Sequence, residues 1–134
     1  MKGMTLKEWT KAYVKYKDMV PRKVETIKET ETGIIAKQKT REETKYICME
    51  SIETLLPGKV DKERVVCLNT KKNLDWLIKN WEQVKDKETV FIFVNLEKAE
   101  SWAVNPRLHN NITDKKNLKQ GLKSLFNSIT EVSG

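Results

Sequence analysis

The stretch that decides the fold is Thr89–Val94, with the sequence Thr-Val-Phe-Ile-Phe-Val. After the threonine every residue is β-branched or aromatic, and no other segment of the chain is so uniformly apolar. Strands that are covered on both faces have this composition, whereas strands with one wet face alternate apolar and polar residues. The sequence therefore predicts a central strand at 90–94, around which the other elements pack.

A second mostly apolar strand is expected at 64–69, and the clearest helical pattern in the chain separates it from the central strand. Within 71–84 apolar residues recur at spacings of three and four, which places them on one side of a helix. These residues are Leu74, Leu77, Ile78, Trp81 and Val84. Trp76 lies off this stripe, so we expect an exposed indole. Strand, helix and strand in this order predict a right-handed crossover between parallel neighbours.

The first element predicted along the chain is a helix at 5–20. It opens with Thr5-Leu6-Lys7-Glu8, a capping box in which the threonine hydroxyl accepts a hydrogen bond from the glutamate amide. Apolar residues follow at helical spacing until Pro21 ends the helix. The opposite face carries a lysine row that is either a solvated surface or a set of binding residues, namely Lys7, Lys11 and Lys15.

After this helix the helical period is lost, and threonines and β-branched residues dominate. Gly33 and the polar run 39–43 are the expected turns. We interpret 24–29, 34–39 and 44–50 as an antiparallel meander. Its first segment is so charged that it is either an edge strand or a continuation of the helix.

The C-terminal third predicts a hairpin and a helix. The return strand of the hairpin is expected at 101–105, and Pro106 restricts it to an edge or an end of the sheet. The last helix is expected at 114–131, with Asp114 as its N-cap and one apolar stripe. Its other side carries Lys115, Lys116, Lys119 and Lys123.

Together these elements predict one domain over residues 1–134. A chain of this length buries roughly two-thirds of its unfolded surface, and no repeat or linker divides it. The expected fold is α/β or α+β, with a mixed sheet of four to five strands and about three helices packed on it.

The composition excludes several classes of protein. No apolar run approaches the roughly 20 residues that cross a bilayer, and the first residues lack the apolar core of a signal peptide. We therefore expect a cytoplasmic protein without a membrane partner. Cys48 and Cys67 lie in apolar runs, as buried reduced thiols do, and two cysteines cannot complete a zinc site.

Familiar catalytic signatures are absent from the sequence. It contains no glycine-rich phosphate loop, no nucleophile elbow, no zinc-protease motif and no calcium loop. The single histidine, His109, rules out any site that needs two imidazoles. We expect no metal and no cofactor, and we favour a protein that is not an enzyme.

The order helix, strands, helix, strand resembles the core of the restriction-endonuclease-like nucleases over about residues 5–96. In that family a hairpin and a third strand present an Asp and a Glu-x-Lys to a magnesium ion, and these groups suit phosphodiester hydrolysis. The resemblance implies a metal-dependent nuclease. The sequence departs from the motif, because the strand taken as the third ends in Cys67-Leu68-Asn69 and Glu50 is the only acid near the Asp position.

The charge balance suggests an anionic partner. The chain has 26 basic and 19 acidic residues and a net charge of +7, although only four of the basic residues are arginines. A basic protein of this kind either binds nucleic acid or uses its lysines for solubility and thermostability.

The most unusual cluster follows the central hairpin, at the mouth of the last helix. It lies between the end of a strand and the four lysines of the helix at 114–131, where a phosphate could bind. Its members are Trp102, Asn105, Pro106, Arg107, His109, Asn110 and Asn111. The alternative is that Trp102 belongs to the core, that Asn110 and Asn111 supply a turn and that Arg107 forms a surface ion pair.

We therefore favour a non-enzymatic binding module with nucleic acid as its ligand. The alternative is a protein-interaction or homo-oligomeric subunit module that uses Trp76 or the strand 101–105. A divergent nuclease is the third hypothesis.

Overall fold

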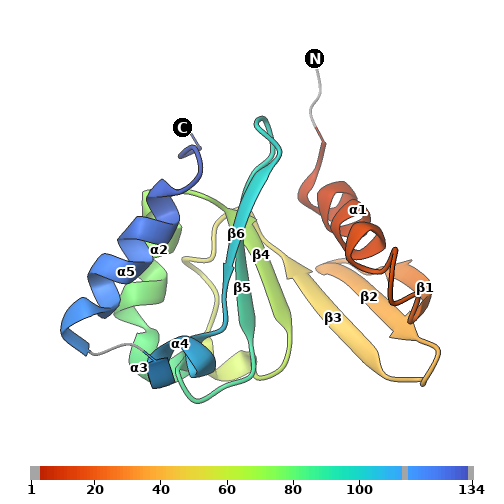
Figure 1. Cartoon of the computed structure of the whole chain (residues 1–134), viewed down its shortest axis with the longest axis horizontal. Helices are drawn as coiled ribbons and strands as arrows, with labels where there is room; N and C mark the ends of the chain where they lie inside the picture. Colours follow the sequence, from red (N-terminus) through yellow and green to blue (C-terminus); the bar gives the residue numbers. More distant parts are fainter. Residues whose placement is uncertain (1–3, 113–114, 133–134) are drawn as a thin grey trace.

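A single mixed sheet carries all the strands of this computed structural model, and it follows the chain in sequence order (Figure 1). The structure describes residues 4–112 and 115–132, without the side chains of 110–116. The sheet strands are β1 Val24–Glu29, β2 Gly33–Gln38, β3 Glu43–Cys48, β4 Arg64–Leu68, β5 Val90–Asn95 and β6 Glu100–Val104. The α-helices are α1 Leu6–Lys17, α2 Lys71–Lys79, α3 Trp81–Val84, α4 Pro106–Ile112 and α5 Lys115–Asn127, and Pro57–Lys59 forms the 3-10 helix η1.

The predicted mixed sheet is confirmed, but it is larger than expected. The described residues form six strands and five α-helices, not four to five strands and about three helices. The charged segment 24–29 is the edge strand β1. The expected helix 71–84 is divided at Asn80, whose backbone leaves the helical region and whose side-chain amide donates to the Trp76 carbonyl oxygen at 2.8 Å.

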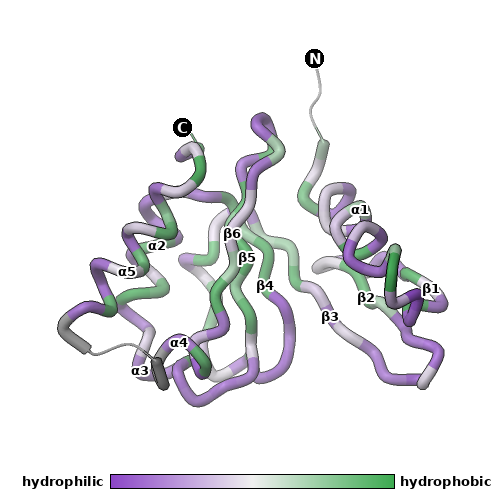
Figure 2. The backbone as a smooth tube through the Cα atoms, viewed as in Figure 1, coloured by the Kyte–Doolittle hydropathy of each residue, from purple (hydrophilic) through white to green (hydrophobic). Residues whose placement is uncertain are grey.

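The parallel core lies where the sequence predicts it. β3, β4 and β5 are mutually parallel, whereas β1, β2 and β6 are each antiparallel to their neighbours. The segment from β4 through α2 and α3 to β5 is the expected crossover. Figure 2 shows the hydrophobic residues concentrated along β4 and β5.

Helices cover both faces of the sheet, and the sheet separates the core under α2, α3 and α5 from the buried residues under α1. Phe91 and Phe93 of β5 pack on the side of α2, α3 and α5, together with Trp102 of β6. Ile92 and Val94 point to the other side, where they pack with Leu6 of α1. Alternation along β5 explains this division, because successive side chains of a strand point to opposite faces. Within the described residues, no helix is both long and apolar enough to span a bilayer.

The N-terminal capping box forms as predicted. The Glu8 amide donates to the Thr5 hydroxyl at 3.1 Å, and the Glu8 carboxylate accepts from the Thr5 amide at 2.9 Å. These bonds lower the pKa of Glu8, the backbone bond being the larger cause. They fix the start of α1 over β2, β3 and β4.

Two buried asparagines fasten the carboxyl end of β4. Asn73, in the first turn of α2, accepts from the Ile52 amide at 2.9 Å and donates to the carbonyl oxygens of Glu50 and Leu68 at 2.7 and 2.8 Å. Thr70 is the N-cap of α2, since its hydroxyl accepts from the Asn73 amide.

Asn69 instead connects β4 to the C-terminal segment. Its side-chain oxygen accepts from the Trp102 indole at 2.7 Å, and its amide donates to the carbonyl oxygens of Phe126 and Thr130. Asn95 donates to the same Thr130 oxygen at 3.0 Å. The chain after α5 is thereby held across the ends of β4 and β5.

The close pairing of β2 and β3 at Gly33 generates a stability prediction. A Cβ at this position would lie 1.8 Å from the backbone oxygen of Tyr46, and a backbone atom cannot move aside cheaply. Gly33→Ala should therefore lower the free energy of unfolding by about 3 kcal/mol, at the upper end of overpacking costs. Gly58→Ala is the matched control, because a Cβ there meets nothing within 4 Å. Urea unfolding followed by circular dichroism measures both, and equal effects would contradict the prediction.

Candidate anion-binding site

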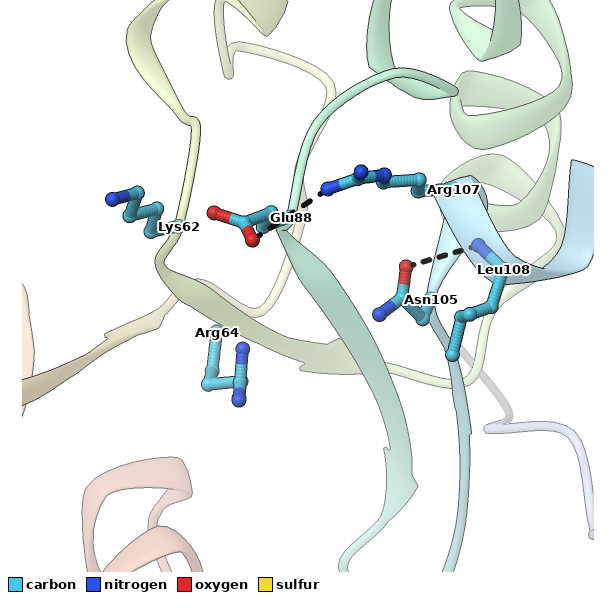
Figure 3. Close-up of a pocket in the computed structure, with 6 residues that line it drawn as sticks. All are labelled: Lys62, Arg64, Glu88, Asn105, Arg107 and Leu108. Carbon is cyan, nitrogen blue, oxygen red and sulfur yellow. Dashed lines mark hydrogen bonds and ion pairs between the residues drawn. The ribbon is translucent and has the colours of Figure 1, made fainter.

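A cavity of about 530 Å³ opens at the amino ends of β4 and β5. Figure 3 shows the side chains around it, which come from the start of β4 and the loop before it, the loop before β5 and the β6–α4 junction. Its lining consists of Lys62, Arg64, Glu88, Asn105, Arg107 and Leu108. Three cations and one acid therefore share this surface.

Arg64 is the half-buried cation of the cavity. It is the first residue of β4, where Val65 and Cys67 point into the core under α2 and α5, so Arg64 points to the α1 side. Among the described residues, no hydrogen bond or ion pair to its guanidinium is found. Keeping a charge partly out of water without a partner costs free energy. A bound anion would remove this cost, so the Arg64 guanidinium is a favourable place for an anion to bind.

Tyr46 lies beside Arg64 and is affected by its positive charge. Tyr46 of β3 is paired with Arg64 across the parallel ladder, so the two side chains share one face. Burial raises the pKa of the Tyr46 hydroxyl, and the positive charge of Arg64 opposes this rise. Half-buried Tyr13 of α1 lies near the same hydroxyl.

Arg107 reaches the cavity from α4. Its guanidinium lies 3.6 Å from the Glu88 carboxylate, and both side chains are more than half exposed. Such an exposed pair contributes little and leaves the arginine available to another anion. The Asn105 side chain accepts from the Leu108 amide at 3.3 Å, which fixes the start of the helix that carries Arg107 (Figure 3).

Of the cluster predicted at this junction, Asn105 and Arg107 line the cavity, whereas Trp102 and His109 do not. Trp102 is 7% exposed, stacks on Phe93 with ring centroids 4.3 Å apart, and donates to Asn69. We therefore assign it to the core. Trp76, expected to be exposed, is 8% exposed and packs against Phe91, so that expectation was wrong.

His109 is half-buried between α3 and α5. Its ring meets the edge of Trp81 at 5.9 Å, and a Cβ on Gly121 would lie 3.7 Å from its Nε2 atom. That Nε2 atom is buried and has no hydrogen-bond partner among the described residues. Burial lowers the pKa of His109 below its ordinary value.

The predicted lysine rows lie on opposite sides of the sheet, because α5 covers one face and α1 the other (Figure 1). On α5, Lys119 and Lys123 are exposed, whereas the side chains of Lys115 and Lys116 lie outside the described residues. On α1, Lys7 donates to the Thr30 carbonyl oxygen at 2.6 Å and Lys11 pairs with Glu29 at 3.5 Å. The two rows therefore do not form one patch.

Sequence reasoning missed Lys62 and Arg64. A signal for Arg64 was present in the sequence, because it is a cation at the start of an otherwise apolar strand. A strand of this composition is covered on both faces, so its first side chain is also expected to be partly buried.

The metal site that the nuclease resemblance implies is absent from the part of the chain that the structure describes. No group of three or more histidine, cysteine, aspartate or glutamate side chains there could hold a metal ion. The third strand of the sheet is β3, and it does contain Glu43-Thr44-Lys45, but both charged side chains are exposed and Glu43 is opposite Lys37.

A larger hollow, of about 770 Å³, lies at the carboxyl end of β4. Its charged lining is mixed, with Lys71 and Lys72 among the acids Glu50, Glu53, Asp75 and Glu131. All six side chains are exposed, so water already solvates them. The cavity at Arg64 is therefore the better candidate.

The half-buried imidazole of His109 predicts a pH dependence of stability. Because folding lowers the pKa of His109, its contribution is fully present above the unfolded value of about 6.5 and is lost as the pH falls toward the folded value. His109→Phe should reduce the loss of unfolding free energy between about pH 7 and pH 5, since the chain has no other histidine. Urea unfolding at each pH measures this, and an unchanged slope would contradict the prediction.

Comparison with known proteins gives no relative for this chain. No protein-family model, no curated protein and no solved structure matches it.

Proposed function

We propose that this protein is a non-enzymatic module that binds nucleic acid through the cavity at Arg64. The observation that carries the proposal is a half-buried guanidinium without a partner among the described residues, in a cavity that also contains Lys62 and Arg107. A phosphate group would accept hydrogen bonds from the planar guanidinium and would remove the cost of its unpaired charge.

The surroundings of the cavity favour a polymer over a free anion. The cavity is open and its cations come from separate elements, so successive phosphates can each meet a different side chain. The net charge of +7 adds long-range attraction for a polyanion. Half-buried Tyr46 lies beside Arg64 across the ladder and offers a ring next to the cation, as in proteins that bind single strands.

The proposal assigns no reaction to the site. The acid at the cavity, Glu88, is already opposite Arg107, and the three cations are suited to hold phosphates, not to cleave them. We place the protein in the cytoplasm, where the free thiols of Cys48 and Cys67 would stay reduced.

Removal of the half-buried cation tests the proposal. Arg64→Ala should weaken binding of a fluorescent oligonucleotide by about tenfold or more, the worth of a charge-assisted contact, and should lower the salt dependence by about one phosphate contact. Arg64→Lys should bind with an affinity between those of the unmodified protein and Arg64→Ala, because it keeps the charge and loses the planar guanidinium. Fluorescence anisotropy over a range of salt concentrations gives both quantities.

Lys123→Ala is the matched control, because it removes the same charge from an exposed position on α5 and leaves the cavity intact. An equal loss in both variants would mean that net charge alone attracts the polymer, and the proposed site would be rejected. Binding by the unmodified protein that does not exceed that of an unrelated protein of equal charge would reject the function itself.

A further inference from the structure

β6 is an open edge of the sheet. It pairs with β5 in continuous antiparallel register, and the described residues place no further strand beyond it. Its inward face carries the buried side chains of Trp102 and Val104, whereas Ser101 and Ala103 on the other face are exposed. An edge strand presents a row of backbone donors and acceptors that another strand can use.

The opposite edge of the sheet is protected in ways that β6 is not. The register of β1 with β2 is irregular between Val24 and Thr26, and its exposed positions include Glu25, Lys28 and Glu29. Irregular pairing and charged side chains are common devices that prevent edge-to-edge association. The exposed side chains of β6, Ser101 and Ala103, are small and uncharged, and its one charged residue, Glu100, lies at its amino end and is half-buried, so the middle of the strand offers no obstacle to a second strand.

The two ends of β6 carry opposite charges. Around its carboxyl end lie the cations of the cavity, Lys62, Arg64 and Arg107, with one acid, Glu88. Around its amino end lie Glu97, Glu100 and Glu131, with one lysine, Lys98. Glu100 accepts from the Thr130 amide at 2.9 Å, and this backbone bond is the main reason that its pKa is lowered.

We infer that β6 pairs antiparallel with β6 of a second copy of this chain, about a two-fold axis near Trp102, so that one sheet runs through both copies. In this arrangement Ser101 lies beside Ala103 of the second copy, and no charged or bulky side chain separates the strands.

Charge complementarity selects a second copy as the occupant. An antiparallel pair brings the basic end of each β6 to the acidic end of the other, and it does so twice. A partner strand of unrelated sequence would have no reason to match both ends. The inference depends on the open edge and on these charges, and it does not depend on nucleic-acid binding.

Self-association without nucleic acid tests the inference. Analytical ultracentrifugation between about 1 µM and about 1 mM should show a monomer–dimer equilibrium that shifts toward monomer as salt is added. Ala103→Lys should raise the dissociation constant by about tenfold or more, because it introduces a charge beside the paired backbone. Thr26→Lys places the same charge at an exposed position on β1 and should leave the equilibrium unchanged.

A charge exchange tests the antiparallel geometry. Arg107→Glu should weaken the dimer, and adding Glu97→Arg to it should restore much of the loss, as expected for residues that meet across the two-fold axis. Both side chains are exposed, so circular dichroism should report unchanged folding.

A monomer over the whole concentration range would overturn the inference. So would a dimer that Thr26→Lys dissociates and Ala103→Lys does not, or an exchange that brings no recovery. Because no oligonucleotide is present in these measurements, their outcome is separate from that of the binding experiment with Arg64→Ala.

Discussion

The packing of α2, β6 and the C-terminal segment around β4 depends on two side-chain amides. They belong to Asn69 and Asn73, which are both fully buried. Each one accepts one hydrogen bond and donates two, so neither has an unmet donor. A buried amide contributes about 1 kcal/mol per hydrogen bond, whereas leaving its partners unpaired costs about 1–3 kcal/mol each. The pair therefore allows little variation in how β4, α2, β6 and the C-terminal segment meet.

These amides also decide which end of the sheet remains open. In sheets with parallel strands, ligands commonly bind beyond the carboxyl ends of the strands. Here the segment held by Asn69 and Asn95 crosses those ends through its Thr130 carbonyl oxygen. The half-buried cation of Arg64, which has no partner within 4–112 and 115–132, lies at the other end. Hydrogen bonds of the fold already occupy the carboxyl ends of β4 and β5, and the candidate site lies at their amino ends instead.

The sequence predicted the parts of the fold that periodicity and local chemistry determine. The apolar run 90–94, the crossover and the capping box at Thr5 are of this kind, because each depends on neighbouring residues. Segment 24–29 has no such signal, and it becomes a strand because β2 offers a partner for its backbone. Trp76 was misplaced because the helix covers more of the core than one stripe, so a residue beside the stripe is also buried.

The site was harder to predict than the fold, since it depends on what each side chain meets. The residue types of Trp102 and His109 suggest a ligand site, yet Trp102 is buried in the core and the Nε2 atom of His109 is covered, and of the charged candidates whose side chains the structure describes it is Arg107 that reaches the cavity. Arg107 also serves both proposals, as a phosphate contact and as the basic end of the β6 pair. Because one guanidinium cannot satisfy both partners fully, nucleic acid and the second copy should oppose each other, and linkage requires that each reduces the affinity for the other by the same factor.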